Sequence, residues 1–422
     1  MERVISFIGL LTMLALAYAL SRQRQRISWR LVGWGVGIQL GLGVLVLGVP
    51  ALGFQGPLRG LFSGANRLVN ALLDFSLEGS RFIFGPLVDT EQMGFIFAFQ
   101  VLPTIIFMSS LMAVLYHWGV MQKLVHVMAL GMQKLMGTSG AESLAAAANV
   151  FVGQTEAPLV VRPYIARMTP SELFTLMVGG MATVAGGVLA AYVGLLRHLV
   201  PDIAGHLLTA SVMSAPAALV VAKIMLPETD KPETLGRSAK EIHESEQGRG
   251  GERYSNTIDA AASGASEGLK LALNVAAMLL AFIALIALVN SGLGLVGAWL
   301  GVELSLQMLL GFVFAPLAFV MGVPLGEVLV AGGFLGEKIV LNEFVAYLNL
   351  AQTTEPLSQR SLVILSYALC GFANFASIAI QIGGIGSLAP ERRGDLARFG
   401  IRSIIAGSLA AFMTASIAGI LI

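Results

Sequence analysis

The sequence predicts an all-α polytopic membrane protein with eight transmembrane helices and two re-entrant hairpins. Three observations carry this prediction: 56% of the 422 residues are hydrophobic, only 12% are charged, and several apolar runs are long enough to cross a bilayer. An average soluble domain carries about 25% charged residues, which cover its surface with polar groups. Lipid solvates apolar surface instead, so this composition is typical of a chain that lies mostly within a membrane.

Eight apolar runs have the length of a membrane span, which is about 20 residues. They cover residues 4–20, 31–53, 93–116, 171–196, 205–226, 269–300, 361–386 and 401–422. The first run also has the apolar character of a signal peptide. Its basic n-region is weak, however, and a dense arginine cluster follows it, so we expect a retained first helix.

Basic residues between the spans predict the orientation of the chain. One group lies between the first two runs and another between the last two: Arg22, Arg24, Arg26 and Arg30, then Arg392, Arg393, Arg398 and Arg402. The positive-inside rule places both groups in the cytoplasm. Both termini of a multi-pass inner-membrane protein then lie in the periplasm. The polar residues 227–268 fall on the cytoplasmic side, where we expect a flexible loop.

An amphipathic helix is expected over residues 57–75. Leu58, Leu61 and Leu68 belong to an apolar series at helical spacing, while Asn66 and Asp74 belong to the polar face. Such a helix is typical of the membrane interface. A helix packed against the rest of the protein is an alternative with nearly the same support.

Residues 141–163 do not fit a simple span. An alanine-rich arm is followed by a polar turn and a short apolar arm. A segment this short is predicted to enter from the cytoplasm, turn at mid-depth and return, which is tolerated only where protein or a cavity surrounds it. Glu156 lies in the turn. An ionisable side chain inside a membrane segment costs on the order of 3 kcal/mol, so Glu156 is a functional candidate rather than a structural carboxylate.

A second broken hairpin is predicted over residues 304–348. Several proline and glycine residues interrupt its apolar sequence, and the polar cluster at 342–347 contains Glu343, to which the same energetic argument applies. Lys338 and Glu337 lie one turn upstream, where we expect them to pair with each other or with Glu343.

Each hairpin is followed by an apolar helix with an interruption, at Thr183–Val188 and at Cys370–Ser377. The two copies begin on opposite sides of the membrane. This is typical of inverted repeats, in which substrate and ion sites lie near the bilayer midplane. No phosphate-binding loop motif for ATP is present, so an ion gradient would have to drive uphill transport. The net charge of +1 gives no indication of a nucleic-acid partner.

Three polar stretches together resemble the concentrative nucleoside transporter family. They are GQTEAP at 153–158, NEFVAY at 342–347 and GFANFASI at 371–378. Each stretch alone is weak, but their combination with the hairpin order is specific and covers essentially the whole chain. The resemblance implies a homotrimer in which a scaffold holds the subunits together and a transport domain moves like an elevator.

The expected domains follow from this resemblance. Residues 1–118 and 269–303 look like scaffold, namely the first three spans with the helix over 57–75, and the sixth span. Residues 140–226 and 304–422 look like the transport domain, namely the two hairpins with the spans that follow them. Residues 227–268 are the cytoplasmic loop between them.

The resemblance also implies the roles of individual residues. The residues expected to bind a nucleoside are Gly153, Gln154, Thr155, Glu156, Val188, Glu343, Phe372, Asn374 and Ser377. Those of the first hairpin would bind the nucleobase, Val188 and Phe372 would flank it, and Glu343 with its neighbours would bind the ribose. The residues expected to bind sodium are Asn149, Val152, Thr183 and Val184. Unwound carbonyls with amide and hydroxyl oxygens suit such a cation.

The sequence therefore predicts a sodium-driven symporter that imports nucleosides of the uridine, cytidine and adenosine class, without an enzymatic cofactor. A proton-coupled transporter, in which Glu156 or Glu343 titrates, is one alternative, although the oxygens of Asn149 and Thr183 favour sodium. A nucleoside-recognition module that gates without concentrative transport is another. An enzyme using the two glutamates as acid and base lacks an adjacent nucleophile, metal or cofactor motif. Purine against pyrimidine preference, stoichiometry and resting conformation stay open.

Overall fold

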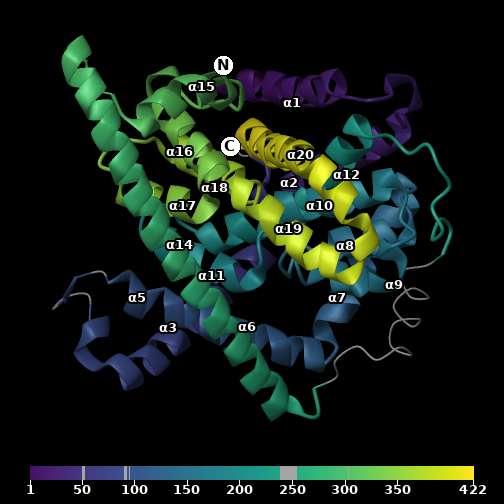
Figure 1. The fold of residues 1–422 in the computed structure, drawn as a ribbon, viewed down its shortest axis with the longest axis horizontal. Helices are drawn as coiled ribbons and strands as arrows, with labels where there is room; N and C mark the ends of the chain where they lie inside the picture. Colours follow the sequence, from purple (N-terminus) through teal and green to yellow (C-terminus); the bar gives the residue numbers. More distant parts are fainter. Residues whose placement is uncertain (50–52, 90–92, 95, 238–253, 303) are drawn as a thin grey trace.

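The computed structural model is almost entirely helical and describes residues 1–49, 53–89, 93–94, 96–237, 254–302 and 304–422 (Figure 1). Within them, seven helices are long and apolar enough to cross a membrane: Glu2–Ala19, Trp29–Leu47, Phe97–His117, Pro170–Leu196, Ile203–Met225, Thr257–Trp299 and Pro390–Leu421. They match seven predicted spans. The eighth, 361–386, is present as α18 (Gln359–Ala368) and α19 (Phe375–Leu388), which are separated at the predicted interruption. The predicted all-α polytopic architecture is confirmed.

Two N-terminal helices, α1 (Glu2–Ala19) and α2 (Trp29–Leu47), precede the amphipathic helix α3 (Arg59–Phe84). The helix predicted over 57–75 is therefore present but continues to Phe84. Its polar side touches protein, since Asn66 Oδ1 accepts a hydrogen bond from the backbone N–H of Ala204. Its apolar side faces outward, with Leu61 66% and Phe75 63% exposed. The helix thus combines the two predicted settings, because one face packs on the protein and the other offers apolar surface to lipid.

The structure adds one helix that the sequence analysis did not assign and lengthens another. The first is α7 (Val120–Met136), which follows α5 (Phe97–Gln100) and α6 (Leu102–His117). The second is α14 (Thr257–Leu300), which begins within the predicted loop 227–268. At about 1.5 Å per residue, its 44 residues exceed the thickness of the hydrocarbon core by a factor of about two. Figure 1 shows α14 crossing the whole molecule obliquely. Some predicted positions, 50–52, 95, 238–253 and 303, lie outside the described residues.

The two halves of the chain repeat one order of elements. The first half runs through α6, α7, α8 (Gly140–Ala148), η4 (Ala157–Val161) with α9 (Arg162–Ile165), α10 (Pro170–Ala182), α11 (Gly186–Leu196) and α12 (Ile203–Met225). The second half runs through α14, α15 (Leu306–Val320), α16 (Val328–Val340), α17 (Glu343–Gln352), α18, α19 and α20 (Arg393–Leu421). Each half is a spanning helix (α5 with α6 in the first half, α14 in the second), one further helix, a broken hairpin, an interrupted helix and a second spanning helix, as predicted for inverted repeats.

This correspondence locates the turn of the second hairpin. Its arms are α16 and α17, and Leu341 and Asn342 connect them. The predicted range of 304–348 was therefore too wide at its start, because α15 is a separate helix in the position that α7 has in the first half. Asn342 ends the turn by capping α17, since its side-chain oxygen accepts a hydrogen bond from the backbone N–H of Val345 at 2.8 Å.

The buried centre of the fold consists of helices from both halves. In α12 and α20, 89% of the residues in the most apolar stretch are buried, against 28% in α1 and 17% in α14. Figure 1 shows α18 and α20 in the middle and α1 along the upper edge. The apolar side chains that α1 and α14 expose need lipid or another subunit around them.

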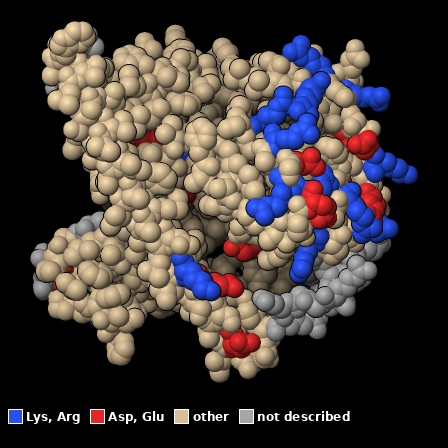
Figure 2. Space-filling model, in the orientation of Figure 1, with Lys and Arg blue, Asp and Glu red and all other residues tan. Residues whose placement is uncertain are grey.

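The basic segments that were predicted to be cytoplasmic lie at one end of the molecule. The backbone N–H of Arg22 donates to Met225 O, and Arg392 Nη1 donates to Met168 O at 2.7 Å. Figure 2 shows most lysine and arginine side chains of this face gathered on the right. The two termini also lie together, since Arg3 Nε donates to Ile422 O at 2.8 Å. Contacts within the chain are thus consistent with the charge pattern used to predict the orientation.

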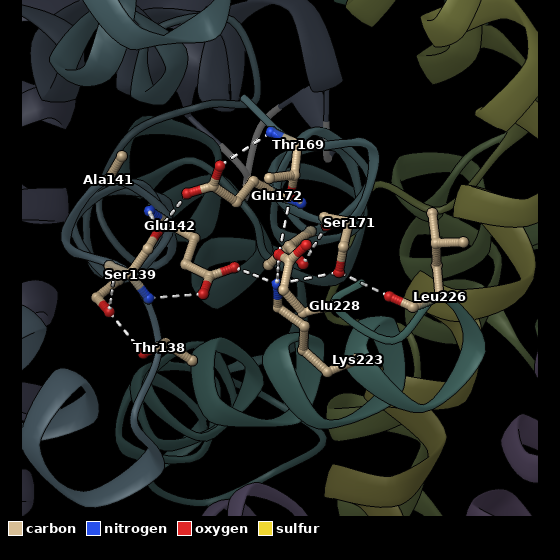
Figure 3. Close-up of polar contacts among 12 residues, drawn as sticks. Thr138, Ser139, Ala141, Glu142, Thr169, Ser171, Glu172, Lys223, Leu226 and Glu228 are labelled. Atoms are coloured by element: carbon tan, nitrogen blue, oxygen red, sulfur yellow. Dashed lines mark hydrogen bonds and ion pairs between the residues drawn. The ribbon is translucent and has the colours of Figure 1, made fainter. Parts of the chain in front are cut away.

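A buried ionic network fixes the base of the first hairpin (Figure 3). Lys223, on α12, lies 2.7 Å from Glu142 Oε2 of α8 and 3.1 Å from Glu228 Oε2. Its ammonium also donates to Ser171 Oγ of α10 at 3.0 Å. Capping boxes begin both α8 and α10, and Ser139 Oγ of the first donates to Glu172 of the second at 2.5 Å. The network joins the hairpin to the two helices that follow it.

Candidate functional site

The turn of the first hairpin and the two helix interruptions meet in the middle of the fold. The backbone N–H of Gly186 donates to Phe151 O at 2.9 Å, and that of Phe372 donates to Thr183 O at 3.2 Å. A Cβ atom at Gly371 would lie 2.9 Å from Met181 O and 3.0 Å from Ala182 O. The backbone segments at the two helix interruptions cross and lie so close together that only glycine, which has no Cβ atom, fits at position 371. Most of the residues predicted to form the site lie at this crossing.

Glu343 is the most completely held of the predicted site residues. It begins α17 and is 5% exposed. Tyr192 of α11 donates from its hydroxyl to Glu343 Oε1 at 2.9 Å, and Asn374 Nδ2 donates to Glu343 Oε2 at 3.0 Å. Asn374 also caps α19, because its Oδ1 accepts a hydrogen bond from the backbone N–H of Ser377 at 2.9 Å. Two neutral donors thus orient a buried carboxylate.

Gln154 is held from α19 at both ends of its amide. Its Nε2 donates to Ser377 Oγ at 3.0 Å, and its Oε1 accepts a hydrogen bond from Gln381 Nε2 at 3.1 Å. Gln154 and Ser377 are both buried. The structure therefore links four predicted residues in two pairs, Gln154 with Ser377 and Glu343 with Asn374, and α19 contributes one member of each pair.

The other predicted residues surround these pairs with different exposure. Glu156 is exposed, whereas Val188 is buried. Gly153, Thr155 and Phe372 are half-buried. A carboxylate that is exposed within the middle of a polytopic fold is available to a ligand or to water, in contrast to the enclosed carboxylate of Glu343.

Sequence reasoning missed two residues of the site. Tyr192 and Gln381 lie in apolar helices without a motif around them, and only their hydrogen bonds to Glu343 and Gln154 identify them. Lys338 was expected to pair with Glu337 or with Glu343. Among the described residues it makes no close ion pair with either, although the charges of Lys338 and Glu343 attract each other. Lys338 Nζ donates to Ala368 O at 2.7 Å, and Glu337 Oε1 accepts from two amides. Consecutive helical residues point in different directions, so these two side chains enter different neighbourhoods.

The predicted sodium ligands meet beside the same crossing. Asn149 ends α8 and is 1% exposed. Its Nδ2 donates to Ala145 O at 3.1 Å, but its buried Oδ1 has no hydrogen-bond partner among the residues that the structure describes. A Cβ atom at Gly179 would lie 3.1 Å from Asn149 Nδ2, and Thr183 Oγ1 donates to Gly179 O at 2.9 Å. Both side chains therefore lie against the same turn of α10.

The donor set fits a hard monovalent cation. An unpartnered buried amide oxygen costs free energy unless a cation or a donor satisfies it. Val152 and Val184 lie in the two non-helical stretches next to Asn149 and Thr183, where backbone carbonyls are free of helical hydrogen bonding. Among the described residues, no group of three or more His, Cys, Asp or Glu side chains has the arrangement of a metal site. The oxygens here are amide, hydroxyl and carbonyl, which are suited to sodium.

Comparison with known proteins gives a consistent result along the chain. Residues 8–87 match the model of the Na+ dependent nucleoside transporter N-terminus, and residues 206–419 match that of its C-terminus. Residues 98–198 match a model described as nucleoside recognition.

Among curated proteins, the chain is 47% identical to an uncharacterized transporter of Haemophilus influenzae over 99% of this chain and 97% of that protein. It is 41% identical to mouse solute carrier family 28 member 3 over 100% of this chain and 59% of that protein. It is 38% identical to rat sodium/nucleoside cotransporter 1 over 100% of this chain and 64% of that protein. The chain thus spans about three-fifths of these two mammalian relatives.

Solved structures of CNTnw have the same fold. An inward-facing, substrate-bound state of CNTnw is 45% identical, with a TM-score of 0.90 over 100% of this chain and 98% of that chain. A variant of CNTnw in an outward-facing state gives a TM-score of 0.91 and 46% identity over the same shares. These matches, together with the family models that follow one another along the sequence, establish that the chain belongs to the family of Na+-dependent, concentrative nucleoside transporters, which are transporters and not enzymes.

Proposed function

We propose that this protein imports nucleosides across the inner membrane by sodium symport, and that the crossing of hairpin and helix interruptions is its binding site. The observation that carries the proposal is the arrangement of Glu343 and Gln154. Each side chain is buried and oriented by α19, and the side chains that hydrogen-bond to each of them in the described part of the chain are neutral. Such groups can exchange their present partners for those of a ligand.

The ribose would bind at Glu343. A carboxylate that accepts from ribose hydroxyls makes charge-assisted hydrogen bonds, which are about twice as strong as neutral ones. Asn374 and Ser377 add an amide and a hydroxyl beside it. A buried polar set of this kind rejects a sugar that lacks the hydroxyls, because its groups are then left unpaired.

The nucleobase would bind at the turn of the first hairpin. Gln154, Thr155 and the exposed Glu156 offer donors and acceptors, and Val188 and Phe372 offer apolar surface for the ring. Uridine, cytidine and adenosine present such a combination of polar edge and apolar face. Sodium would bind at Asn149, Val152, Thr183 and Val184, where the unpartnered Asn149 Oδ1 supports it.

The proposed mechanism is movement of a transport domain against a scaffold. The transport domain would contain both hairpins, α10–α12 and α18–α20, and three of these spans, Pro170–Leu196, Ile203–Met225 and Pro390–Leu421, are mostly buried. The scaffold would contain α1–α3, α6 and α14. The apolar side chains that α14 exposes, such as Leu280 at 76%, support a homotrimer in which α14 is partly covered by another subunit. The arginine clusters support a cytoplasmic location of that end and a periplasmic location of both termini.

Uptake into proteoliposomes tests the proposal. Labelled uridine and adenosine would be offered with an inward sodium gradient, an inward proton gradient or neither. Accumulation that requires inward sodium is expected. Accumulation driven only by protons would move the coupling to Glu156 or Glu343, and the absence of accumulation under either gradient would favour a module that recognises nucleosides without concentrative transport.

A further inference from the structure

Gln381 lies outside every motif that carries the family resemblance, yet it contacts two parts of the site. It is on α19 and is fully buried, with 0% exposure. Its Nε2 donates to Gln154 Oε1 at 3.1 Å and to Met177 O of α10 at 3.0 Å. One amide group therefore joins the turn of the first hairpin to α10.

On the hairpin side, Gln381 determines how Gln154 is oriented. Because Gln154 Oε1 accepts from Gln381, its Nε2 is directed to the other side, where it donates to Ser377 Oγ. Without the donor on Gln381, the Gln154 amide would lose one of its two partners and with it a fixed orientation. In the proposed function, Gln154 is one of the residues that bind the nucleobase.

On the other side, Gln381 holds the part of α10 that carries the ion ligands. Two residues after Met177 lies Gly179. Its carbonyl accepts a hydrogen bond from Thr183 Oγ1, and its Cα faces the Asn149 side chain. A cation that draws the oxygens of Asn149 and Thr183 together would act on this turn of α10 first. Met177 O is the atom through which Gln381 contacts the same turn.

The space between these groups is closely packed. A Cβ atom at Gly180 would lie 2.8 Å from Gln154 Cβ and 2.8 Å from Gln381 Nε2. A displacement of α10 is therefore transmitted to both amides, since packed interiors have little free volume to absorb it.

We propose that Gln381 is a positioning residue that couples sodium binding to nucleoside binding. This inference rests on the proposed function of the site. Bound sodium fixes the position of the turn of α10 and of the end of α8. Gln381, which hydrogen-bonds to this turn and to Gln154, then holds the Gln154 amide in the orientation that binds the nucleobase. Coupling of this kind is reciprocal, so the nucleoside raises the affinity for sodium by the same factor by which sodium raises the affinity for the nucleoside.

The test is the dissociation constant of uridine for the purified protein, measured by titration calorimetry in saturating sodium and with choline in place of sodium. Adenosine is the second probe. The ratio of the two constants is expected to be on the order of 5- to 150-fold in the unmodified protein. In Gln381→Leu the ratio is expected to fall to about one, while the sodium-free constant changes by about threefold or less. The matched control is Gln39→Leu, which removes a buried amide that donates only to its own helix, at Gly35 O.

An unchanged ratio in Gln381→Leu would overturn the inference and leave the proposed function intact. Equal constants with and without sodium in the unmodified protein would overturn the proposed function itself, so the two failures differ. If thermal melting finds Gln381→Leu unfolded, Gly180→Ala decides instead. Its methyl group would press on Gln154 Cβ and on Gln381 Nε2 and displace the two side chains relative to each other. The ratio is therefore expected to fall, and an unchanged ratio there would also overturn the inference.

Discussion

The hydroxyl of Tyr192 donates a hydrogen bond of 2.9 Å to Glu343 Oε1, and the two residues come from different halves of the repeated fold. Tyr192 belongs to the interrupted helix of the first half, and Glu343 begins the second arm of the second hairpin. The carboxylate proposed to bind ribose is thus oriented by the half that is proposed to bind the nucleobase. This contact gives the first prediction about specificity.

Replacing Tyr192 by Phe is expected to weaken nucleoside binding and to reduce discrimination against deoxyribose. A hydrogen bond to a charged group contributes about 1.5–3 kcal/mol, so the affinity is expected to fall by about tenfold or more. Competition of uptake by uridine, 2′-deoxyuridine and 3′-deoxyuridine measures both effects. Tyr367→Phe is the control, because its buried hydroxyl lies near His206 Nδ1 rather than Glu343. Equal discrimination in all three proteins would contradict the role given to Tyr192.

Replacing Glu343 by Gln is expected to abolish most uptake while the protein stays folded. The amide keeps the shape of the side chain but loses the charge-assisted hydrogen bonds, at a cost of about 1.5–3 kcal/mol per bond. Uptake of labelled uridine by proteoliposomes measures the loss, and size-exclusion chromatography tests the fold. Glu156→Gln is expected to behave similarly. Normal uptake by well-folded forms of both variants would refute the assignment of the binding site.

How far the sequence predicted this site depends on the kind of signal each residue gave. Glu343 and Glu156 stood out because a carboxylate in an apolar segment is costly, and that argument needs no neighbour. Tyr192 and Gln381 gave no such signal, since an aromatic or an amide side chain in a membrane helix is unremarkable until its partner is known. Their partners lie 151 and 227 residues away along the chain.

The fold was predictable as far as each helix gave a signal of its own in the sequence. Long apolar runs identified the spans. Because α7 and α15 are shorter than a span, α7 was not assigned and α15 was included in the second hairpin. The sequence did not locate the turn of the second hairpin, because proline and glycine interrupt the chain at several places between residues 316 and 336, whereas the turn at Leu341 and Asn342 contains neither. Its place at Leu341 and Asn342 became clear only from the order of helices in the two halves.

Replacing Asn149 by Ala is expected to raise the sodium concentration for half-maximal uptake by about tenfold or more. The variant removes the buried oxygen that has no hydrogen-bond partner, so its main loss would be a ligand for the cation. Uridine uptake at increasing sodium and constant ionic strength measures the change. Asn290→Ala is the control, because Asn290 bonds to Gln307 on α15, away from the turn of α10. An unchanged sodium dependence would exclude Asn149 as a ligand.

Replacing Gly371 by Ala is expected to disturb the crossing of the two interruptions. The added methyl group would meet the carbonyl oxygens of Met181 and Ala182, and backbone atoms cannot move aside as a flexible side chain can. Overpacking of this kind costs about 1–3 kcal/mol, so both the melting temperature and uridine uptake are expected to fall. Gly383→Ala lies on the neighbouring helix with open space around it and is expected to change neither. A Gly371→Ala protein with normal stability and uptake would show that the two interrupted segments can move apart without loss of function.

Replacing Lys223 by Met is expected to destabilise the protein without acting on the binding site directly. The ammonium is 7% exposed and balances the carboxylates of Glu142 and Glu228, so its removal leaves buried charge without a partner. Removing one member of a buried ion pair costs about 3–5 kcal/mol, because the desolvation of the other member is no longer offset. The melting temperature in detergent measures this loss, and Lys231→Met, at an exposed position, is the control. The double variant Lys223→Met with Glu142→Gln is expected to recover part of the stability, since it removes one of the unpaired charges. If that variant were less stable than Lys223→Met alone, the charge balance would not be what the network provides, and its hydrogen bonds to Ser171 and Ser139 would carry its contribution instead.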